Sequence, residues 1–265
     1  MGVAKLEAAS RVQTKMGNNL IASGGVSRPV DGAASAQKGE SFSSPGTDSF
    51  AEVCRRLDSR PLSYRFVKRA FDIAFSACVI AVGLVPCALL SAAIAADTKG
   101  SPIYCQERIG RLGRPFRIYK FRTMVADADD VEKHLSPEQL AQWRRERKVD
   151  DDPRVTHLGC VLRKTSLDEL PQFANVLLGQ LSIIGPRAIT SDELIEYGVD
   201  VPLLLSVPQG ITGAWQAGAR NGATFETGER QRIELEYVRC ASLREDARVF
   251  LATFGAMFGK RKTGR

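Results

Sequence analysis

The stretch IAFSACVIAVGLVPCALLSAAIAA, residues 73–96, holds 24 consecutive residues without a charged side chain. As a single α-helix it would be roughly 36 Å long, which is enough to cross a membrane hydrocarbon core of about 30 Å. An apolar run of this length is more typical of a membrane helix than of a buried helix in a soluble protein. The stretch therefore decides the fold, because the rest of the chain must be arranged around a membrane segment.

A proline inside this stretch, and the charges on either side of it, predict how the segment meets the membrane. Pro86 separates 13 residues from 10, limbs of roughly 20 and 15 Å that are each too short to cross. Basic residues flank both ends, and the positive-inside rule places such flanks in the cytosol. They are Arg55, Arg56, Arg60, Arg65, Lys68 and Arg69 before the stretch, and Lys99, Arg108, Arg111, Arg114 and Arg117 after it. We therefore predict a membrane-associated re-entrant helix within residues 56–99, broken at Pro86.

Residues 1–55 differ from this segment in composition. They are rich in Ala, Ser and Gly and show no sustained apolar period, so we predict a disordered N-terminal tail. No apolar h-region follows Met1, so a cleaved secretory signal is not expected.

The composition limits the classes of partner. A net charge of +7 and a pI near 9.2 favour acidic partners such as nucleic acid, anionic lipid or a phosphorylated substrate. The six cysteines include no CxxC pair, so neither a zinc site nor a disulfide framework is predicted. This cysteine usage favours a reduced, cytosol-facing location.

Residues 100–265 are predicted to form a cytosolic catalytic domain, and the whole chain to be α+β and mainly helical. Residues 102–109 and 116–121 are rich in aromatic and β-branched residues and are joined by a turn with Gly and Pro, which predicts a small β-hairpin. Residues 243–258 carry apolar side chains at helical spacing before a basic run at 260–262, which predicts an amphipathic C-terminal helix. Its apolar face could lie at the membrane interface or on the protein's own core, and the pattern leaves both open.

The run Arg163-Lys164-Thr165-Ser166-Leu167-Asp168-Glu169-Leu170-Pro171 places two adjacent carboxylates before an apolar helix. Ser166 and Glu169 fit a capping box, in which they would satisfy free N–H groups of that helix. Two neighbouring carboxylates are also a common basis for a nucleophile, a base or a magnesium site, and Arg163 and Lys164 could hold a phosphate. The spacing alone leaves both interpretations open.

Several short motifs along the chain occur together in one known family. They are Lys68-Arg69-Ala70-Phe71-Asp72, Gln106-Glu107-Arg108-Ile109-Gly110, Tyr119-Lys120-Phe121-Arg122-Thr123-Met124, Asp151-Asp152-Pro153-Arg154-Val155-Thr156, Ser166-Leu167-Asp168-Glu169-Leu170-Pro171-Gln172 and Gly185-Pro186-Arg187. With these motifs, residues 65–258 resemble the bacterial monotopic phosphoglycosyl transferases, also called bacterial sugar transferases, which start exopolysaccharide and related glycan assembly. The sequence departs from the family pattern at Val85, where a serine usually precedes the proline, and at Glu234, where an aspartate is usual.

The resemblance implies a reaction in two steps on the cytosolic face of the bacterial inner membrane. Asp168 would attack the β-phosphorus of a UDP-sugar and release UMP, and undecaprenyl phosphate would then take the sugar phosphate from Asp168. Glu169 would complete the acidic pair, and the cofactor Mg²⁺ would lie near Asp168. Downstream glycosyltransferases would be partners. By the same resemblance, the residues that bind the substrate phosphates and the nucleotide would be Lys120, Arg163, Arg187, Arg220 and Glu234.

The competing interpretation is a non-catalytic, membrane-attached interaction or regulatory protein whose acidic pair is only a helix cap. It predicts no UMP release with any UDP-sugar. A nucleic-acid-binding protein would suit the net charge, but we find no nucleic-acid recognition motif and the apolar stretch would be left without a role. The transferase interpretation is therefore preferred. Galactose or glucose as the transferred sugar follows from the resemblance alone.

Overall fold

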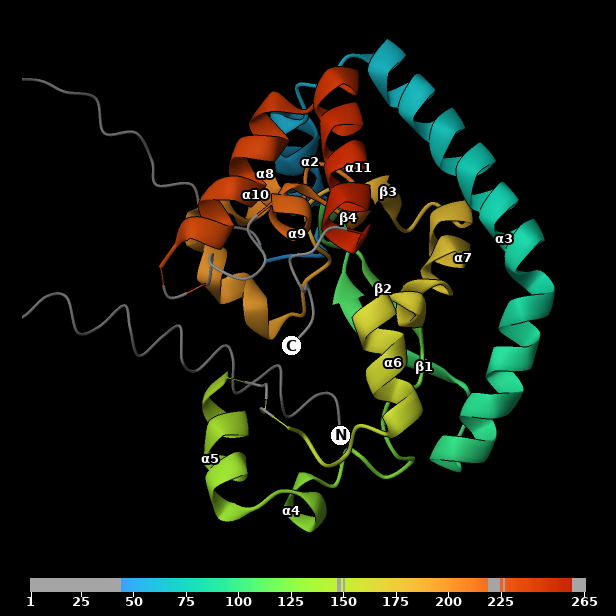
Figure 1. The fold of residues 1–265 in the computed structure, drawn as a ribbon. Coiled ribbons are helices and arrows are strands. Elements are labelled where there is room, and N and C mark those ends of the chain that lie inside the picture. Colours follow the sequence, from blue (N-terminus) through green and yellow to red (C-terminus); the bar gives the residue numbers. More distant parts are fainter. Residues whose placement is uncertain (1–43, 147–148, 150, 219–224, 226, 259–265) are drawn as a thin grey trace, which may run out of the picture. The chain divides into compact units, whose positions relative to one another are not determined.

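The computed structural model describes residues 44–146, 149, 151–218, 225 and 227–258 (Figure 1). All of them belong to one compact unit, Phe42–Arg265. In chain order the helices are α2 (Asp48–Leu57), α3 (Leu62–Thr98), α4 (Val131–His134), α5 (Pro137–Glu146), α6 (His157–Thr165), α7 (Gln172–Leu177), α8 (Val201–Leu204), α9 (Ala214–Gly218), α10 (Glu229–Cys240) and α11 (Leu243–Phe258). The strands are β1 (Ile103–Ile109), β2 (Pro115–Phe121), β3 (Ser182–Ile184) and β4 (Gly210–Thr212), and the 3-10 helices are η1 (Arg111–Gly113), η2 (Leu167–Glu169) and η3 (Asp192–Asp200). The described residues are mainly helical, as predicted.

The apolar stretch lies within α3, a single helix of 37 residues. By length and composition, α3 is long and apolar enough to cross a membrane, and it is the one such helix in the described part of the chain. Its middle is open to the surroundings, with Val82 76% and Leu89 70% exposed. The prediction that Pro86 breaks the helix is wrong, because α3 continues through it. A proline removes one backbone hydrogen bond and its ring crowds the carbonyl one turn earlier, which bends a helix without always ending it, and the ribbon of α3 is visibly curved (Figure 1).

Both ends of α3 pack on the same domain. Near the first end, the Asp72 carboxylate accepts hydrogen bonds from Ser182 Oγ (3.1 Å) and from the Ile183 N–H (3.0 Å) at the start of β3. Near the other end, Ile94 is fully buried in a cluster with Phe121 of β2 and Leu162 of α6. The exposed middle of the helix therefore lies between two anchored ends.

The predicted β-hairpin is confirmed. Strands β1 and β2 are antiparallel, with Ile103 opposite Phe121 and Ile109 opposite Pro115. Side chains alternate across a strand, so the core residues Phe116 and Ile118 share a face with Lys120. The hairpin therefore carries Lys120 to the edge of the core.

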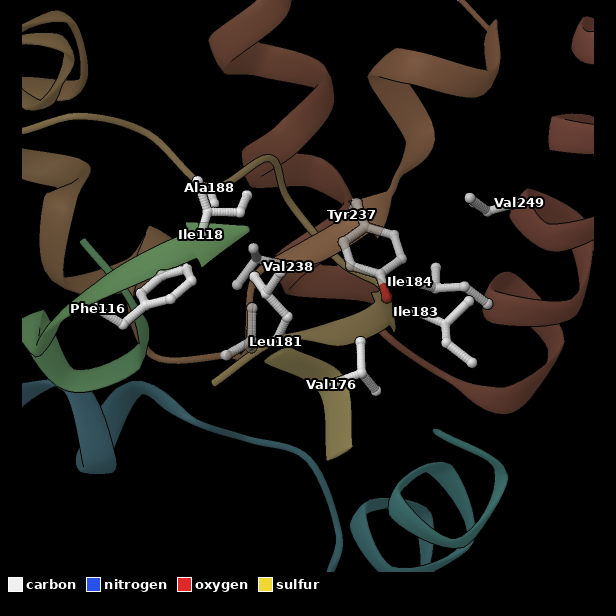
Figure 2. Packing of buried hydrophobic residues seen from close by; sticks show 11 residues of the cluster. Phe116, Ile118, Val176, Leu181, Ile183, Ile184, Ala188, Tyr237, Val238 and Val249 are labelled. Carbon is white, nitrogen blue, oxygen red and sulfur yellow. The ribbon is translucent and has the colours of Figure 1, made fainter. Parts of the chain in front are cut away.

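The main core lies where this hairpin meets β3, α10 and α11 (Figure 2). Strands β3 and β4 form a short parallel pair. Helix α11 supplies Val249, which is 3% exposed, to this core, whereas Leu251 on the same helix is 70% exposed. Of the two placements that the sequence left open for the C-terminal helix, the structure shows packing on the core, and it leaves part of the apolar surface uncovered.

The prediction of a disordered tail up to residue 55 is wrong at its C-terminal end. Residues 48–55 belong to α2, and Thr47 Oγ1 caps this helix by accepting from the Phe50 N–H at 3.2 Å. Phe50 and Cys54 are buried in a second apolar cluster that includes Ile109 and Leu205. A helix this short is stabilised mainly by tertiary packing, which composition does not reveal. Residues 1–43 lie outside the described part of the chain.

Candidate active site

The acidic pair lies in η2, between α6 and α7. Ser166 ends α6 in the left-handed conformation, with φ of 57°. In the described structure its side chain makes no capping hydrogen bond to η2, and Pro171 holds the N-cap position of α7. The capping-box interpretation is therefore wrong. A tight turn instead holds Asp168 and Glu169 between two helices.

The two carboxylates have different surroundings. Glu169 Oε1 is 3.0 Å from Lys120 Nζ, and both side chains are about four-fifths buried, with 23% and 22% exposed. Asp168 is half-buried, and within the described residues its carboxylate has no side-chain hydrogen bond or ion pair. Glu169 is therefore held in place by a cation, while the oxygens of Asp168 remain available.

Burial raises the pKa of Asp168 above its ordinary value, and the neighbouring charge of Glu169 raises it further. Lys120 and Arg163 act in the opposite direction and lower the same pKa. Asp168 is thus a more basic carboxylate than a solvated aspartate.

Arg163 reaches this region from the last turn of α6. Its Nε donates to Thr123 Oγ1 at 2.9 Å. The approach of α6 to Thr123 requires the glycine at position 159, since a Cβ there would lie 2.0 Å from the Thr123 carbonyl oxygen. The glycine therefore allows α6 to bring Arg163 beside the acidic pair.

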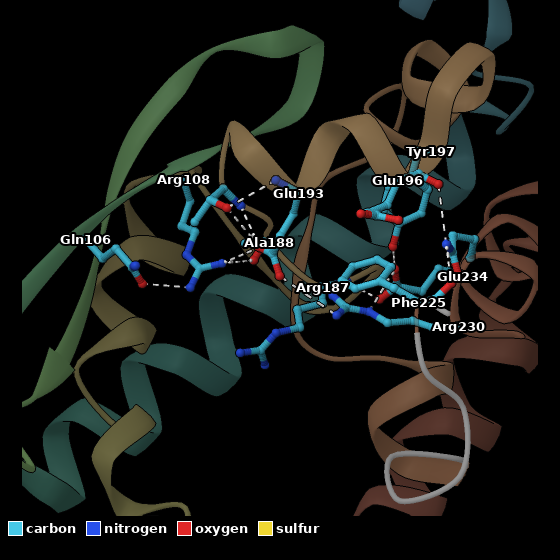
Figure 3. Close-up of polar contacts among 12 residues, drawn as sticks. Gln106, Arg108, Arg187, Ala188, Glu193, Glu196, Tyr197, Phe225, Arg230 and Glu234 are labelled. Carbon is cyan, nitrogen blue, oxygen red and sulfur yellow. Dashed lines mark hydrogen bonds and ion pairs between the residues drawn. The ribbon is translucent and has the colours of Figure 1, made fainter. Parts of the chain in front are cut away.

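A narrow cleft next to the acidic pair collects several of the predicted residues. It is lined by Arg108, Ile118, Lys120, Glu169, Gln172, Arg187, Ala188, Gly210 and Ile211. Among the described residues, the Arg187 guanidinium makes no hydrogen bond or ion pair, and Figure 3 shows it pointing away from the polar network behind it. Lys120, Glu169 and Arg187 thus meet in one cleft, and Asp168 adjoins it in sequence.

The turn that presents Arg187 is held from behind. The Gly185 N–H donates to the Thr212 carbonyl (2.9 Å), and a Cβ at residue 185 would lie 2.4 Å from the Pro208 carbonyl oxygen. The Glu234 carboxylate, 1% exposed, accepts from the Arg187 backbone N–H at 3.1 Å and from the Tyr197 hydroxyl. Glu234 does not line the cleft, so it acts on the site by positioning the Arg187 backbone.

One predicted site residue is not described by the structure, and one residue that lines the cleft was not predicted. Arg220 lies outside the described residues. Arg108 was not among the predicted site residues, yet it lines the cleft beside Arg187. Its place in the Gln106-Glu107-Arg108 motif was the available signal, but the motif does not say which of its side chains points into a site.

The donor set at Asp168 fits Mg²⁺ in one specific way. In the described part of the chain, no group of three or more His, Cys, Asp or Glu residues could hold a metal ion. Mg²⁺ in phosphoryl-transfer sites is commonly bound by one or two carboxylates together with substrate phosphates and water. The carboxylate of Asp168, which has no side-chain partner among the described residues, suits that arrangement. The described residues do not suit a site in which protein ligands alone hold the ion.

Comparison with known proteins assigns the class. Residues 63–260 match the bacterial sugar transferase family, so this chain belongs to that family, as the motifs predicted. It is 38% identical over 198 residues to a UDP-galactose-lipid carrier transferase of Erwinia amylovora, covering 74% of this chain and 41% of the relative. It is 40% identical over 194 residues to an undecaprenyl-phosphate galactose phosphotransferase of Salmonella typhimurium, covering 72% of this chain and 40% of the relative.

A third relative is similar over most of its own length. The exopolysaccharide production protein ExoY of Rhizobium meliloti is 36% identical over 193 residues, covering 72% of this chain and 84% of the relative. This chain thus spans about two fifths of the length of the first two relatives and most of the third. The matched region contains the acidic pair and all of the cleft residues.

Proposed function

We propose that this protein transfers a sugar-1-phosphate from a UDP-sugar to undecaprenyl phosphate and releases UMP, as the first membrane step of exopolysaccharide or related glycan synthesis. The observation that carries the proposal is the free, half-buried carboxylate of Asp168 beside the Lys120–Glu169 pair and a cleft lined by arginines. The names of the relatives, two of which specify galactose, support a hexose donor.

In the first step, an Asp168 oxygen forms a bond to the β-phosphorus of the UDP-sugar. The bond from that phosphorus to the bridging oxygen breaks, and UMP leaves with the bridging oxygen and its electron pair. In the second step, an undecaprenyl phosphate oxygen attacks the same phosphorus and the Asp168 carboxylate leaves. Splitting one displacement into two through an aspartyl phosphate is an established use of a carboxylate nucleophile.

The cations have separate tasks in this scheme. Lys120 holds Glu169 at 3.0 Å, which keeps the second carboxylate away from the phosphorus and limits its repulsion of the substrate. Arg163 and Arg187 would donate to the non-bridging oxygens, where charge develops during phosphoryl transfer. Mg²⁺, held by Asp168 together with the substrate phosphates, would neutralise diphosphate charge.

We also propose that α3 is re-entrant and that the catalytic domain lies on the cytosolic face of the inner membrane, and the packing of α2 supports the re-entrant placement. Helix α2 precedes α3 and β1 follows it, yet Phe50 of α2 and Ile109 of β1 share one buried cluster. A helix that crossed the membrane would place these two residues on opposite sides. Their burial together supports a placement in which both flanks lie on the same side and α3 enters the bilayer and returns.

A UMP-release assay with undecaprenyl phosphate and a panel of UDP-sugars tests the reaction. We expect release with one or a few UDP-hexoses, UDP-galactose among the first to be tried, and covalent labelling of Asp168 by a donor radiolabelled in its sugar. A folded, membrane-bound protein that releases no UMP with any donor would instead be the non-catalytic protein considered above.

The placement of α3 is tested by labelling in intact cells. Arg56 on α2 has a 79% exposed side chain, so Arg56→Cys supplies a reactive thiol without entering the core. We expect an impermeant maleimide to label it only after the cells are opened. Labelling in intact cells, above that of the unsubstituted protein, would place α2 outside and reject the re-entrant helix.

A further inference from the structure

Arg108 and Arg187 are brought side by side by the backbone. Arg108 is the penultimate residue of β1, and the next residue, Ile109, donates its N–H to the Ile189 carbonyl at 2.9 Å in an isolated antiparallel bridge. This bridge fixes the end of β1 against the chain that leaves the Gly185-Pro186-Arg187 turn. Both arginines then line the same cleft.

The guanidinium of Arg108 is held in one orientation but is not saturated (Figure 3). Its Nη1 donates to the Ala188 carbonyl (3.2 Å) and to Glu193 Oε2 (3.0 Å), and its Nη2 donates to Gln106 Oε1 (2.7 Å). Within the described residues its Nε has no acceptor. A guanidinium has five N–H donors, so Arg108 keeps donors in reserve after these contacts.

The nearby carboxylates do not balance the arginines. Glu193 is shared, because it also lies 3.9 Å from Nη1 of the buried Arg230 and accepts from the Thr190 N–H at 2.8 Å. Glu234 is fully buried, and burial raises its pKa towards the neutral form. Glu169 also lines the cleft, but it is paired with Lys120. Arg108, Arg187 and Arg230 are left with Glu193, which is shared, and with Glu234, which is buried and lies 3.8 Å from Arg230 Nε.

The surplus of positive charge acts on Arg108 itself. The pKa of Arg108 is lowered to about 10, first by burial and then by the like charge of Arg187, while Glu193 offsets only part of this. Two guanidinium groups that repel each other across a cleft are relieved when an anion binds between them.

We propose that Arg108 is a second arginine ligand, together with Arg187, for the diphosphate group of the donor substrate. The inference rests on the proposed function and adds a substrate-binding residue to it. The diphosphate is the chemical class that fits, because its four non-bridging oxygens can accept from two guanidinium groups at once, whereas a carboxylate can satisfy only one in a bidentate manner.

The test uses the purified full chain in detergent and inorganic pyrophosphate as the probe, with binding measured by calorimetry. Arg108→Gln removes the charge and most donors from the cleft. Arg114→Gln is the matched control, since it makes the same charge change at an exposed position of the same hairpin. We expect Arg108→Gln to weaken pyrophosphate binding by about tenfold to a hundredfold, and Arg114→Gln to change it by less than about twofold. A folded Arg108→Gln protein with the dissociation constant of the wild type would overturn the proposal.

Arg108 also holds Ala188 and Glu193, so Arg108→Gln could fail to fold, and melting temperatures are measured for each variant. In that case Arg108→Lys tests whether residue 108 binds the diphosphate, because lysine keeps the positive charge and one contact to Glu193 but loses the planar guanidinium. Weakened pyrophosphate binding at an unchanged melting temperature supports the proposal, and unchanged binding overturns it. The readout is independent of the transfer reaction: a wild type that binds pyrophosphate through Arg108 but releases no UMP would refute the proposed function alone.

Discussion

Two groups of charged side chains in this protein differ in how their charges are satisfied. At the start of α3, Lys68 Nζ lies 2.8 Å from Asp246 Oδ2, and the hydroxyls of Tyr64 and Tyr237 also donate to Asp246, at 2.8 and 2.5 Å. In the cleft, the Arg187 guanidinium has no such partner among the described residues, and the Asp168 carboxylate, beside the cleft residue Glu169 in sequence, has no side-chain partner among them either. The first group is complete without a ligand and the second is not.

The difference separates structural charge from functional charge. Arg69 also belongs to the group whose charges are satisfied within the protein. It donates to the Val176 and Leu177 carbonyls at 2.6 and 2.9 Å, at the end of α7. An unpaired charge that is partly removed from water costs free energy, so a fold keeps one where a ligand supplies the missing partner. Changes to the first group should therefore act on stability, and changes to the second on turnover.

The largest effect is expected for Asp168→Asn. Loss of the proposed nucleophile should lower the rate of UMP release by about four orders of magnitude or more. The melting temperature at pH 7 should be unchanged or higher, because the pKa of Asp168 is raised by burial and ionisation of this group costs folding free energy. A lower melting temperature together with near-normal turnover would show that Asp168 acts on stability and not on turnover.

The sign of that stability effect can be checked against pH. A carboxyl whose folded pKa is raised contributes stability below the unfolded pKa, about 3.9, and loses it as the pH rises through the folded pKa. The gain from Asp168→Asn should therefore be present at neutral pH and vanish below about pH 4. Thermal unfolding of the two proteins in the same detergent, as a function of pH, measures it.

In the structural group, Lys68→Met should destabilise the protein by about 3 kcal/mol or more, since it leaves a buried aspartate without its cation. The two side chains are 6% and 9% exposed. Arg55→Met is the matched control, because the Arg55–Glu52 pair is about half exposed and such pairs contribute about 0–1 kcal/mol. Melting temperatures decide the point, and UMP release per folded molecule should be retained in both variants.

Arginine-to-lysine changes at positions 163 and 187 should have a smaller effect, chiefly on turnover, although Arg163→Lys also loses the hydrogen bond from Nε to Thr123. Lysine keeps the charge but loses the planar fork that binds phosphate oxygens in pairs. We expect kcat/KM for the UDP-sugar to fall by roughly tenfold to 150-fold, which corresponds to about 1.5–3 kcal/mol. Unchanged kcat/KM in both variants would place these arginines in the structural group.

The smallest effect concerns the pH dependence of the first step. In the proposed first step Asp168 must be ionised to attack, so UMP release should fall on acidification with a midpoint above the ordinary aspartate pKa of about 3.9. Glu169→Gln should move this midpoint down, because the charge of Glu169 raises the pKa of Asp168 and its removal also frees Lys120 to act on Asp168. A midpoint that moves up, or not at all, would show that Asp168 does not control the profile.

Local properties of the sequence determined the parts of this protein that depend on one segment at a time. The length and apolarity of residues 73–96 are enough to predict a helix that could cross a membrane, and β-branched and aromatic residues around a Gly- and Pro-containing turn are enough to predict the hairpin. The adjacency of Asp168 and Glu169 is itself a sequence fact. The same reasoning overestimated Pro86, since a proline disfavours the helix interior but did not end a helix whose two ends are anchored by packing.

Tertiary structure alone decided which residues meet. Ser166 could have capped a helix, but the turn at the end of α6 uses it in the left-handed conformation instead. Phe50 is separated from Ile109 by the whole of α3, and Arg108 from Arg187 by more than four elements, so their spacing in the chain carries no signal of contact. Packing between distant segments buries Phe50 with Ile109 and places Arg108 and Arg187 in one cleft. Sequence patterns describe only neighbours along one element, whereas side-chain contacts form between residues that are close in space.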